Sequence, residues 1–411
     1  MGDWAALPDD ILVIILQLIV IGKDHCSFGC VCRSWRRAAL LFLSIFVPKG
    51  APCLIVPDKN TSCSSIPDQH RRLLLAFQIG KDIAEIEGFL PQIRIPPRDI
   101  CLGSYQGWLV MISKYVKIYI WNPFSCTSID LLMCKYYRLS GLQLCMLSLY
   151  EKEIKLAVLD MYISKAILST VPTAPNCFIF IIYGYKNFAF CNVSDKVWRY
   201  MVRPQSKHDP TTTPQSYTDA IYFKGQFYIV SASGEIFSCD VTASRPGLIS
   251  VYGPPPKTLS AHQWYLVECR GELYRVMQQL MRCRFAAGKD DDACIGIDNQ
   301  DLHQALDEHF RGESYGCNGF EVHKLMSDTV GWIQVRNFEG DAVFLGRNQS
   351  FSLSNPGDYG YKPNRIYFTD HRSINNDMGV FNPEDGTMES PLYKTNSRFI
   401  VPPAIWMTPN T

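Results

Sequence analysis

The chain has 411 residues, of which 47% are hydrophobic, with 40 Lys and Arg against 39 Asp and Glu. This length exceeds one ordinary single-core domain unless repeated units share it, so we expect a small domain and a large one. The net charge of +1 gives no means of holding a polyanion, which argues against nucleic acid as the principal partner.

The first predicted element is a strongly apolar run, ILVIILQLIVI, at residues 11–21. A membrane-spanning helix needs about 20 apolar residues, and this run is too short. A signal peptide begins with positive charge, whereas MGDWAALPDD is acidic. We therefore expect no membrane segment. The run is instead predicted to form a helix that begins at Pro8, carries Asp9 and Asp10 against its N-terminal dipole and stops near Gly22.

A second helix is predicted after Asp24, which can cap it. Its apolar residues recur in steps of three and four, namely Phe28, Val31, Cys32, Trp35 and Ala39. The helices end near Pro48, and a helical unit of about 45 residues rarely buries enough surface to be stable alone. Because the first helix is apolar almost all round, it must be covered on two sides. A protein partner is one expectation, and packing as a helical cap on the large domain is the other.

These residues resemble the F-box family, whose pattern runs Leu-Pro, an acidic residue, an Ile/Leu-rich helix and then Val-Cys-Arg-x-Trp. The matching stretches are Leu7-Pro8, Asp9-Asp10, Ile11 to Ile15, and VCRSWR from Val31 to Arg36. The sequence departs from the pattern at His25, where Leu is usual, and it lacks the usual second Leu-Pro after the first helix.

The resemblance implies that residues 1–48 form a three-helix F-box domain that binds the Skp adaptor of a cullin-based ubiquitin ligase. The residues that it assigns to the adaptor interface are Leu7, Pro8, Ile11, Leu12, Ile15, Val31, Cys32 and Trp35. Some of them are also candidates for the core of the helical domain itself.

Residues 49–88 are expected to be a connecting segment, since they are rich in Pro, Ser and Asp and show no sustained period. From 89 to 411, short β-branched and aromatic runs are separated by Gly, Asn, Asp and Pro, which predicts an all-β domain. Apolar runs turn at Gly107, Lys224-Gly225, Arg270-Gly271 and Glu339-Gly340. Units of roughly 40 to 50 residues predict a kelch-like β-propeller with six or seven blades. A sandwich or two smaller β domains is the alternative architecture.

Four tryptophans, Trp108, Trp198, Trp264 and Trp332, flank predicted strands and are expected to anchor blade packing. Residues 288–319 interrupt the strand pattern and are predicted to be a polar, acidic, exposed insert. The insert contains GESYG, which matches the G-x-S-x-G nucleophile motif at Ser314. That motif requires a strand before the serine and a helix after it, and the predicted order here is the reverse.

The 16 cysteines are scattered through apolar stretches, which indicates buried free thiols in a reducing compartment. No CxxC pair, phosphate-binding Gly-rich loop or dinucleotide fingerprint is present. We therefore expect no metal site, no cofactor and no catalytic residue.

The layout as a whole resembles the plant F-box proteins that carry a kelch-like C-terminal domain of unknown function. WYLVECRGELYRV, DAVFLGRNQSFSLS and NRIYFTD are similar to that family's recurrent blocks. The resemblance implies a non-catalytic substrate receptor in the cytoplasm or nucleus, which binds the adaptor and through it a cullin, while the propeller holds an unknown protein target. The alternative is a propeller scaffold outside any ligase, which burial of Leu12, Ile15 and Trp35 against the propeller would favour.

Overall fold

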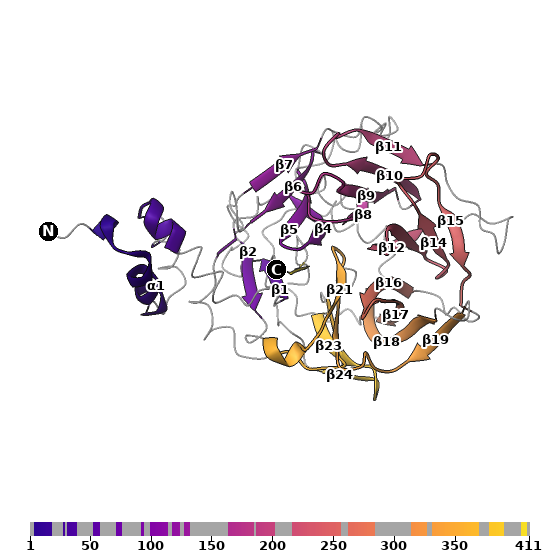
Figure 1. Ribbon diagram of the computed structural model, residues 1–411. Coiled ribbons are helices and arrows are strands. Elements are labelled where there is room, and N and C mark those ends of the chain that lie inside the picture. The colour runs from indigo at the N-terminus through magenta and orange to yellow at the C-terminus, as the bar shows by residue number, and fades with distance from the viewer. Residues whose placement is uncertain are drawn as a thin grey trace, which may run out of the picture.

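The structure is a computed structural model (Figure 1). The residues that it describes are 4–18, 28, 31–38, 52–57, 71–75, 92–93, 99–113, 117–123, 127–131, 163–184, 186–201, 216–255, 262–283, 314–326, 331–369, 378–389 and 404–408.

The N-terminal part is helical, as predicted. A 3₁₀ turn, η1 (Trp4–Ala6), precedes the α-helix α1 (Asp9–Leu18), and residues 33–38 are also helical. The amide of Leu12 donates to the Pro8 carbonyl at 3.1 Å, so the first helical hydrogen bond is accepted by the predicted starting residue. The predicted stop at Gly22 and the cap at Asp24 lie outside the described residues.

The remainder of the described chain consists almost entirely of strands, which form six antiparallel or mixed sheets arranged in a ring (Figure 1). Four sheets contain consecutive strands in simple order. They are β4 (Ile100–Tyr105), β5 (Trp108–Ile112), β6 (Ile118–Asn122) and β7 (Thr127–Asp130); β8 (Ile163–Leu168), β9 (Phe178–Tyr183), β10 (Asn187–Asn192) and β11 (Trp198–Met201); β12 (Tyr217–Phe223), β13 (Gln226–Ser231), β14 (Ile236–Cys239) and β15 (Ile249–Tyr252); and β16 (His262–Cys269), β17 (Glu272–Cys283), β18 (Ser314–Met326) and β19 (Gly331–Val335).

The fifth sheet has five strands in the order β21-β20-β22-β23-β24. Their bounds are β20 (Ala342–Leu345), β21 (Ser350–Leu353), β22 (Ile366–Thr369), β23 (Met378–Asn382) and β24 (Thr387–Glu389). The 3₁₀ turn η4 (Pro356–Tyr359) lies between β21 and β22. It lies in the link that returns the chain to the far side of β20, so that β22 pairs with β20 in parallel.

The sixth sheet joins both ends of the β domain, in the order β25-β1-β2-β3. Its strands are β1 (Cys53–Pro57), β2 (Arg71–Leu75), β3 (Gln92–Ile93) and β25 (Ile405–Met407). Because β1 pairs with β2 on one side and with β25 on the other, the C-terminal strand closes the ring against the N-terminal strands. Five blades are thus each built from one continuous stretch of the chain, and this number differs from the six or seven blades expected. The sixth sheet, which combines strands from both ends of the β domain, completes the ring.

Two predicted boundaries differ from the structure. Segment 49–88 was expected to be a connection, yet β1 and β2 lie within it and belong to the closing sheet. The apolar run CLIVP is only five residues long, too short to show a period among its Pro and Ser neighbours. The predicted insert also ends earlier than expected, because residues 314–319 are part of β18. Residues 288–313 lie outside the described residues.

The tight turns are confirmed by the backbone. Gln106 and Gly107 have φ of 42° and 78°, and Lys224 and Gly225 have φ of 44° and 86°. The same pair of positive φ values recurs at the hairpin Arg270-Gly271, and also at Glu339-Gly340, which lies in the link between the fourth and fifth sheets and is not a hairpin. Two-residue hairpins that match the strand twist need φ above zero at both positions, and glycine adopts it without strain.

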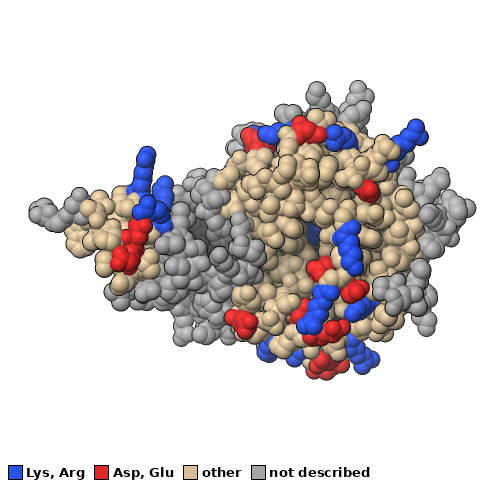
Figure 2. All heavy atoms as spheres, in the orientation of Figure 1, with Lys and Arg blue, Asp and Glu red and all other residues tan. Residues whose placement is uncertain are grey.

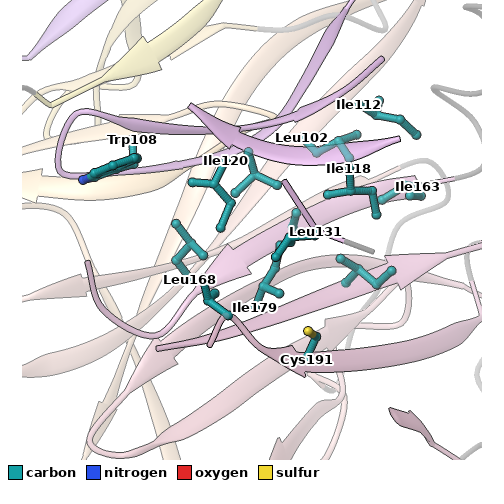
Figure 3. Close-up of a cluster of buried hydrophobic side chains, with 14 of the residues drawn as sticks. Leu102, Trp108, Ile112, Ile118, Ile120, Leu131, Ile163, Leu168, Ile179 and Cys191 are labelled. Carbon is teal, nitrogen blue, oxygen red and sulfur yellow. The ribbon is translucent and has the colours of Figure 1, made fainter. Parts of the chain in front are cut away.

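The cores lie between neighbouring sheets. One cluster packs Ile120 and Leu102 of the first sheet against Leu168 and Ile179 of the second (Figure 3). Close approach here depends on Gly103, because a Cβ at this position would lie 1.9 Å from the Ala166 carbonyl oxygen on β8. All four predicted tryptophans contribute to such packing. Trp108 and Trp264 are buried in two of the clusters, and Trp198 and Trp332 pack half-buried against the same two.

Candidate functional site

The helical unit has a small core of its own. Leu12, Leu16, Phe28 and Ala38 are buried, and Leu7, Ile15 and Trp35 pack against them partly buried. The rings of Phe28 and Trp35 lie 4.2 Å apart between centroids. Leu12 and Leu16 are four residues apart, which places both on the same face of α1. All members of this core come from residues 7–38, so the helices pack on each other.

Polar side chains connect the start of the chain to the helix over residues 33–38. The indole Nε1 of Trp35 donates to the Trp4 carbonyl at 2.8 Å, and the Ser34 hydroxyl donates to the Ala5 carbonyl at 3.1 Å. The Arg37 guanidinium pairs with Asp9 at 2.7 Å. The acidic residue and the Trp of the F-box pattern therefore both have structural roles in holding η1 and the two helices together.

The outer surface of this unit is unusually apolar. Trp4, Ile11, Ile14 and Val31 are 66%, 40%, 51% and 56% exposed. They are four of the eight exposed large hydrophobic residues in the described part of the chain, and the other four are spread over the propeller, on β15, β19 and β24 and just before β11. Ile11 and Ile14 are three residues apart and are neighbours on one face of α1. This concentration on so small a unit marks it as the candidate interaction site.

The eight predicted interface residues divide into three groups. Pro8, Ile11 and Val31 are exposed. Leu7, Ile15, Cys32 and Trp35 are half-buried at the edge of the core. Leu12 differs from the prediction, because it is completely buried against Leu16 and its neighbours and has no surface to offer.

Two surface residues were not predicted. Ile14 was detectable, since it follows the exposed Ile11 by three residues and lies away from the Leu12–Leu16 face. Trp4 lies outside the Leu-Pro to Val-Cys-Arg-x-Trp pattern, and the bonds of the Trp4 and Ala5 carbonyls to Trp35 and Ser34 show that η1 belongs to this unit.

The axis of the propeller contains a buried ion pair. Lys165 on β8 and Asp219 on β12 approach to 2.6 Å, and both are almost fully buried. Asp219 also accepts the amide of Leu266 on β16 at 2.9 Å and the hydroxyl of Ser350 on β21 at 3.5 Å. One carboxylate thus joins four sheets, and the arrangement stabilises the ring.

A second polar group joins the first, fifth and sixth sheets. The side-chain amide of Asn348 donates to the Trp406 carbonyl at 2.6 Å and to the Ser104 hydroxyl at 2.7 Å, and its oxygen accepts the Trp406 amide at 3.1 Å. The Trp406 indole donates to the Leu345 carbonyl at 3.1 Å. These bonds hold β25 in the ring where the two ends of the β domain meet.

The described residues contain no evident catalytic group. Ser314 is the first residue of β18, and the strand continues for twelve residues, so the helix that a nucleophile elbow requires is absent there. Burial raises the pKa of the Cys177 thiol to about 11 and of Cys239 and Cys269 to about 12, which keeps these sulfurs protonated and unreactive. Within the described ranges, no group of three His, Cys, Asp or Glu could hold a metal ion.

The cysteine prediction agrees with the structure where it can be checked. Eight described cysteines are free, and six of these are buried. Among the described helices, none is both long and apolar enough to cross a membrane.

On the face that Figure 2 shows, the described charged residues of the propeller do not gather into a patch of one sign. On this face, positive and negative side chains are interspersed over the sheets of β16–β19 and β20–β24. Several of them pair, including Arg270 with Asp341 at 2.9 Å and Lys362 with Glu389 at 2.6 Å.

Comparison with known proteins supports the division into helices and propeller. Residues 80–382 match the KIB1-4 beta-propeller family, and residues 4–45 match the F-box-like family. The kelch type of repeat, predicted from the sequence, is not what the matching family describes, and it stays a prediction. Among solved structures, apo AztD from Citrobacter koseri is 10% identical with a TM-score of 0.34, covering 88% of this chain and 99% of its own. That score is too low to add to the argument.

Two curated relatives from Arabidopsis thaliana match along nearly the full length. F-box protein At2g17690 is 22% identical over 94% of this chain and 96% of its own. F-box protein SKIP23 is 22% identical over 95% of this chain and 88% of its own. With a propeller match over more than half of its residues, an F-box-like N-terminus and these relatives, the chain belongs to the KIB1-4 beta-propeller family of plant F-box proteins.

Proposed function

We propose that this protein is the substrate receptor of a Skp-cullin-F-box ubiquitin ligase in the cytoplasm or nucleus. The helical unit docks a Skp-type adaptor, and through it a cullin, while the propeller holds a protein target. The chain contributes no catalytic residue, because the ubiquitin chemistry belongs to other subunits. The observation that supports this most is the exposed apolar surface of Trp4, Ile11, Ile14 and Val31 on a unit that matches the F-box-like family.

The docking surface we propose comprises the exposed residues Pro8, Ile11, Ile14 and Val31, bordered by the half-buried Leu7, Ile15, Cys32 and Trp35. Leu12 supports this surface from below as part of the core. Trp35 does so as well, because its indole N–H donates to the Trp4 carbonyl and its ring packs against Phe28 at a tilt. Variants at Leu12 or Trp35 would therefore perturb folding and docking together.

A pair of aspartates on the outer face separates the two effects. In an Ile11→Asp, Ile14→Asp variant, we expect the affinity for a purified Skp-type adaptor to fall at least about 100-fold, since two charges would be desolvated in an apolar interface. Isothermal titration calorimetry with the full chain measures this loss. Ile249→Asp on β15 is a matched control, because Ile249 is 54% exposed but lies on the propeller, and it should bind as the native chain does.

Equal adaptor affinity in the native chain and the double variant, with both folded, would contradict the proposed docking surface. The scaffold alternative would then regain support. The scaffold alternative predicts that Leu12, Ile15 and Trp35 are buried against propeller strands. In the described core, these three residues instead pack with other residues of the helical unit.

A further inference from the structure

Arg275 is a buried cation without a counter-ion. It lies on β17, its side chain is 1% exposed, and it forms no ion pair with any carboxylate in the described ranges. The Nη1 atom donates to the Gly234 carbonyl at 2.7 Å, which satisfies one of its five N–H groups with a neutral acceptor. Burying an unpaired charge is costly, so its surroundings must compensate.

Two indole rings provide part of that compensation. The guanidinium carbon lies 5.1 Å from the ring centroid of Trp264 and 4.5 Å from that of Trp332. Arginine is attracted to the faces of aromatic rings, most strongly to tryptophan. These contacts offset part of the desolvation of the charge but leave its Nε–H without an acceptor. Burial accordingly lowers the pKa of Arg275 to about 10.

Three neighbouring residues here each have a buried polar side-chain atom without a hydrogen-bond partner. These atoms are Nε of Arg275, Nδ1 of His323 and Nε1 of Trp332. His323 on β18 is the direct cross-strand partner of Arg275, and Trp332 on β19 lies against the guanidinium. Unsatisfied buried polar atoms are rare in native proteins, and a cluster of them indicates a bound water or ion.

The carboxylates near this cluster have other partners. Glu321 on β18 accepts the side-chain amide of Gln279 at 2.8 Å, and Glu235 accepts the Ser250 hydroxyl at 2.5 Å. The direct neighbour His323 is not an anion, and its pKa is lowered by burial and by the Arg275 charge. Neither carboxylate forms a direct ion pair with Arg275, and Arg275 Nε and Trp332 Nε1 are N–H donors without an acceptor.

We propose that the seam between the third and fourth blades binds a small inorganic anion of halide size, held by Arg275 Nε, Trp332 Nε1 and the Nδ1–H tautomer of His323. All three groups donate, and the guanidinium supplies the charge. Trp332 also packs against Tyr252 of β15 on the third blade, with ring centroids 5.7 Å apart, so an anion here would strengthen the contact between blades. This inference is independent of the proposed ligase role.

Bromide is the probe for this site, because it resembles chloride and can be located by anomalous scattering. Crystals of the full chain soaked in sodium bromide are expected to show an anomalous peak between Arg275 Nε and Trp332 Nε1. In solution, the midpoint of thermal unfolding should rise with bromide and saturate, when ionic strength is held constant with sodium gluconate, whose anion is too large for the site.

Trp332→Phe tests the geometry while it keeps the aromatic face over Arg275. We expect bromide to bind the variant about tenfold more weakly, since one N–H donor to the ion is lost. Lys224→Met is the matched control, because Lys224 is an exposed cation 4.8 Å from the Phe223 ring and should not alter the bromide response.

Two outcomes would overturn the proposal. One is ordinary water density at the three atoms with no anomalous peak. The other is a bromide effect on unfolding that is the same in the native chain and in Trp332→Phe, which would show general salt stabilisation only.

Discussion

Replacing Trp406 with Ala is expected to lower the free energy of unfolding of the propeller by about 3–5 kcal/mol, the usual range for removing a buried tryptophan. Trp406 is fully buried on β25, and its ring meets Phe344 edge-to-face at 5.1 Å between centroids. Its indole also donates to the Leu345 carbonyl, which would lose its partner. Because β25 joins the two ends of the β domain, the substitution would weaken the strand pairing that closes the ring.

Denaturant unfolding followed by circular dichroism measures this loss without depending on tryptophan fluorescence. A domain is typically stable by about 5–15 kcal/mol, so this loss would remove a large share of the stability of the propeller. Trp198→Ala is the control, because Trp198 is half-buried on the outer strand β11. If both variants lost the same small amount of stability, β25 would not be the closing strand that we describe.

Replacing Asp219 with Ala is expected to cost about 3–5 kcal/mol, because it leaves the Lys165 ammonium buried without a counter-charge. The substitution also removes the acceptor of the Leu266 amide and the Ser350 hydroxyl. The loss would therefore affect four sheets together.

Two further variants separate charge from packing. Lys165→Met combined with Asp219→Leu removes both charges at similar volume, and we expect it to be clearly more stable than Asp219→Ala alone. Asp130→Ala breaks the pair between Lys117 and Asp130, which has the similar distance of 2.7 Å but is exposed, and this should cost less than about 1 kcal/mol. Equal denaturation midpoints for Asp219→Ala and Asp130→Ala would show that burial of the central pair carries no special cost.

The sequence predicted those features that depend on neighbouring residues. The turns at Lys224-Gly225 and Arg270-Gly271 were predictable because Gly in a hairpin has a local conformational reason. The same is true of α1, which begins beside Pro8 with two acidic residues in its first turn.

Features that depend on distant parts of the chain were not predictable in this way. The pairing of β1 with β25 joins residues about 350 positions apart, and nothing in CLIVP itself identifies that partner. The family pattern placed Leu12 in the interface, since it cannot distinguish an apolar residue that faces a partner from one that faces its own core. The unpartnered Arg275 was equally hidden, because its burial results from two tryptophans on different strands.

Hydrogen–deuterium exchange of the full chain, with and without a purified Skp-type adaptor, tests the central claim most directly. We expect the adaptor to slow amide exchange in η1, α1 and residues 31–38 and to leave exchange in the strands of the ring unchanged. Protection on the propeller strands, or no change within residues 4–38 while the adaptor is bound, would contradict docking through the helical unit.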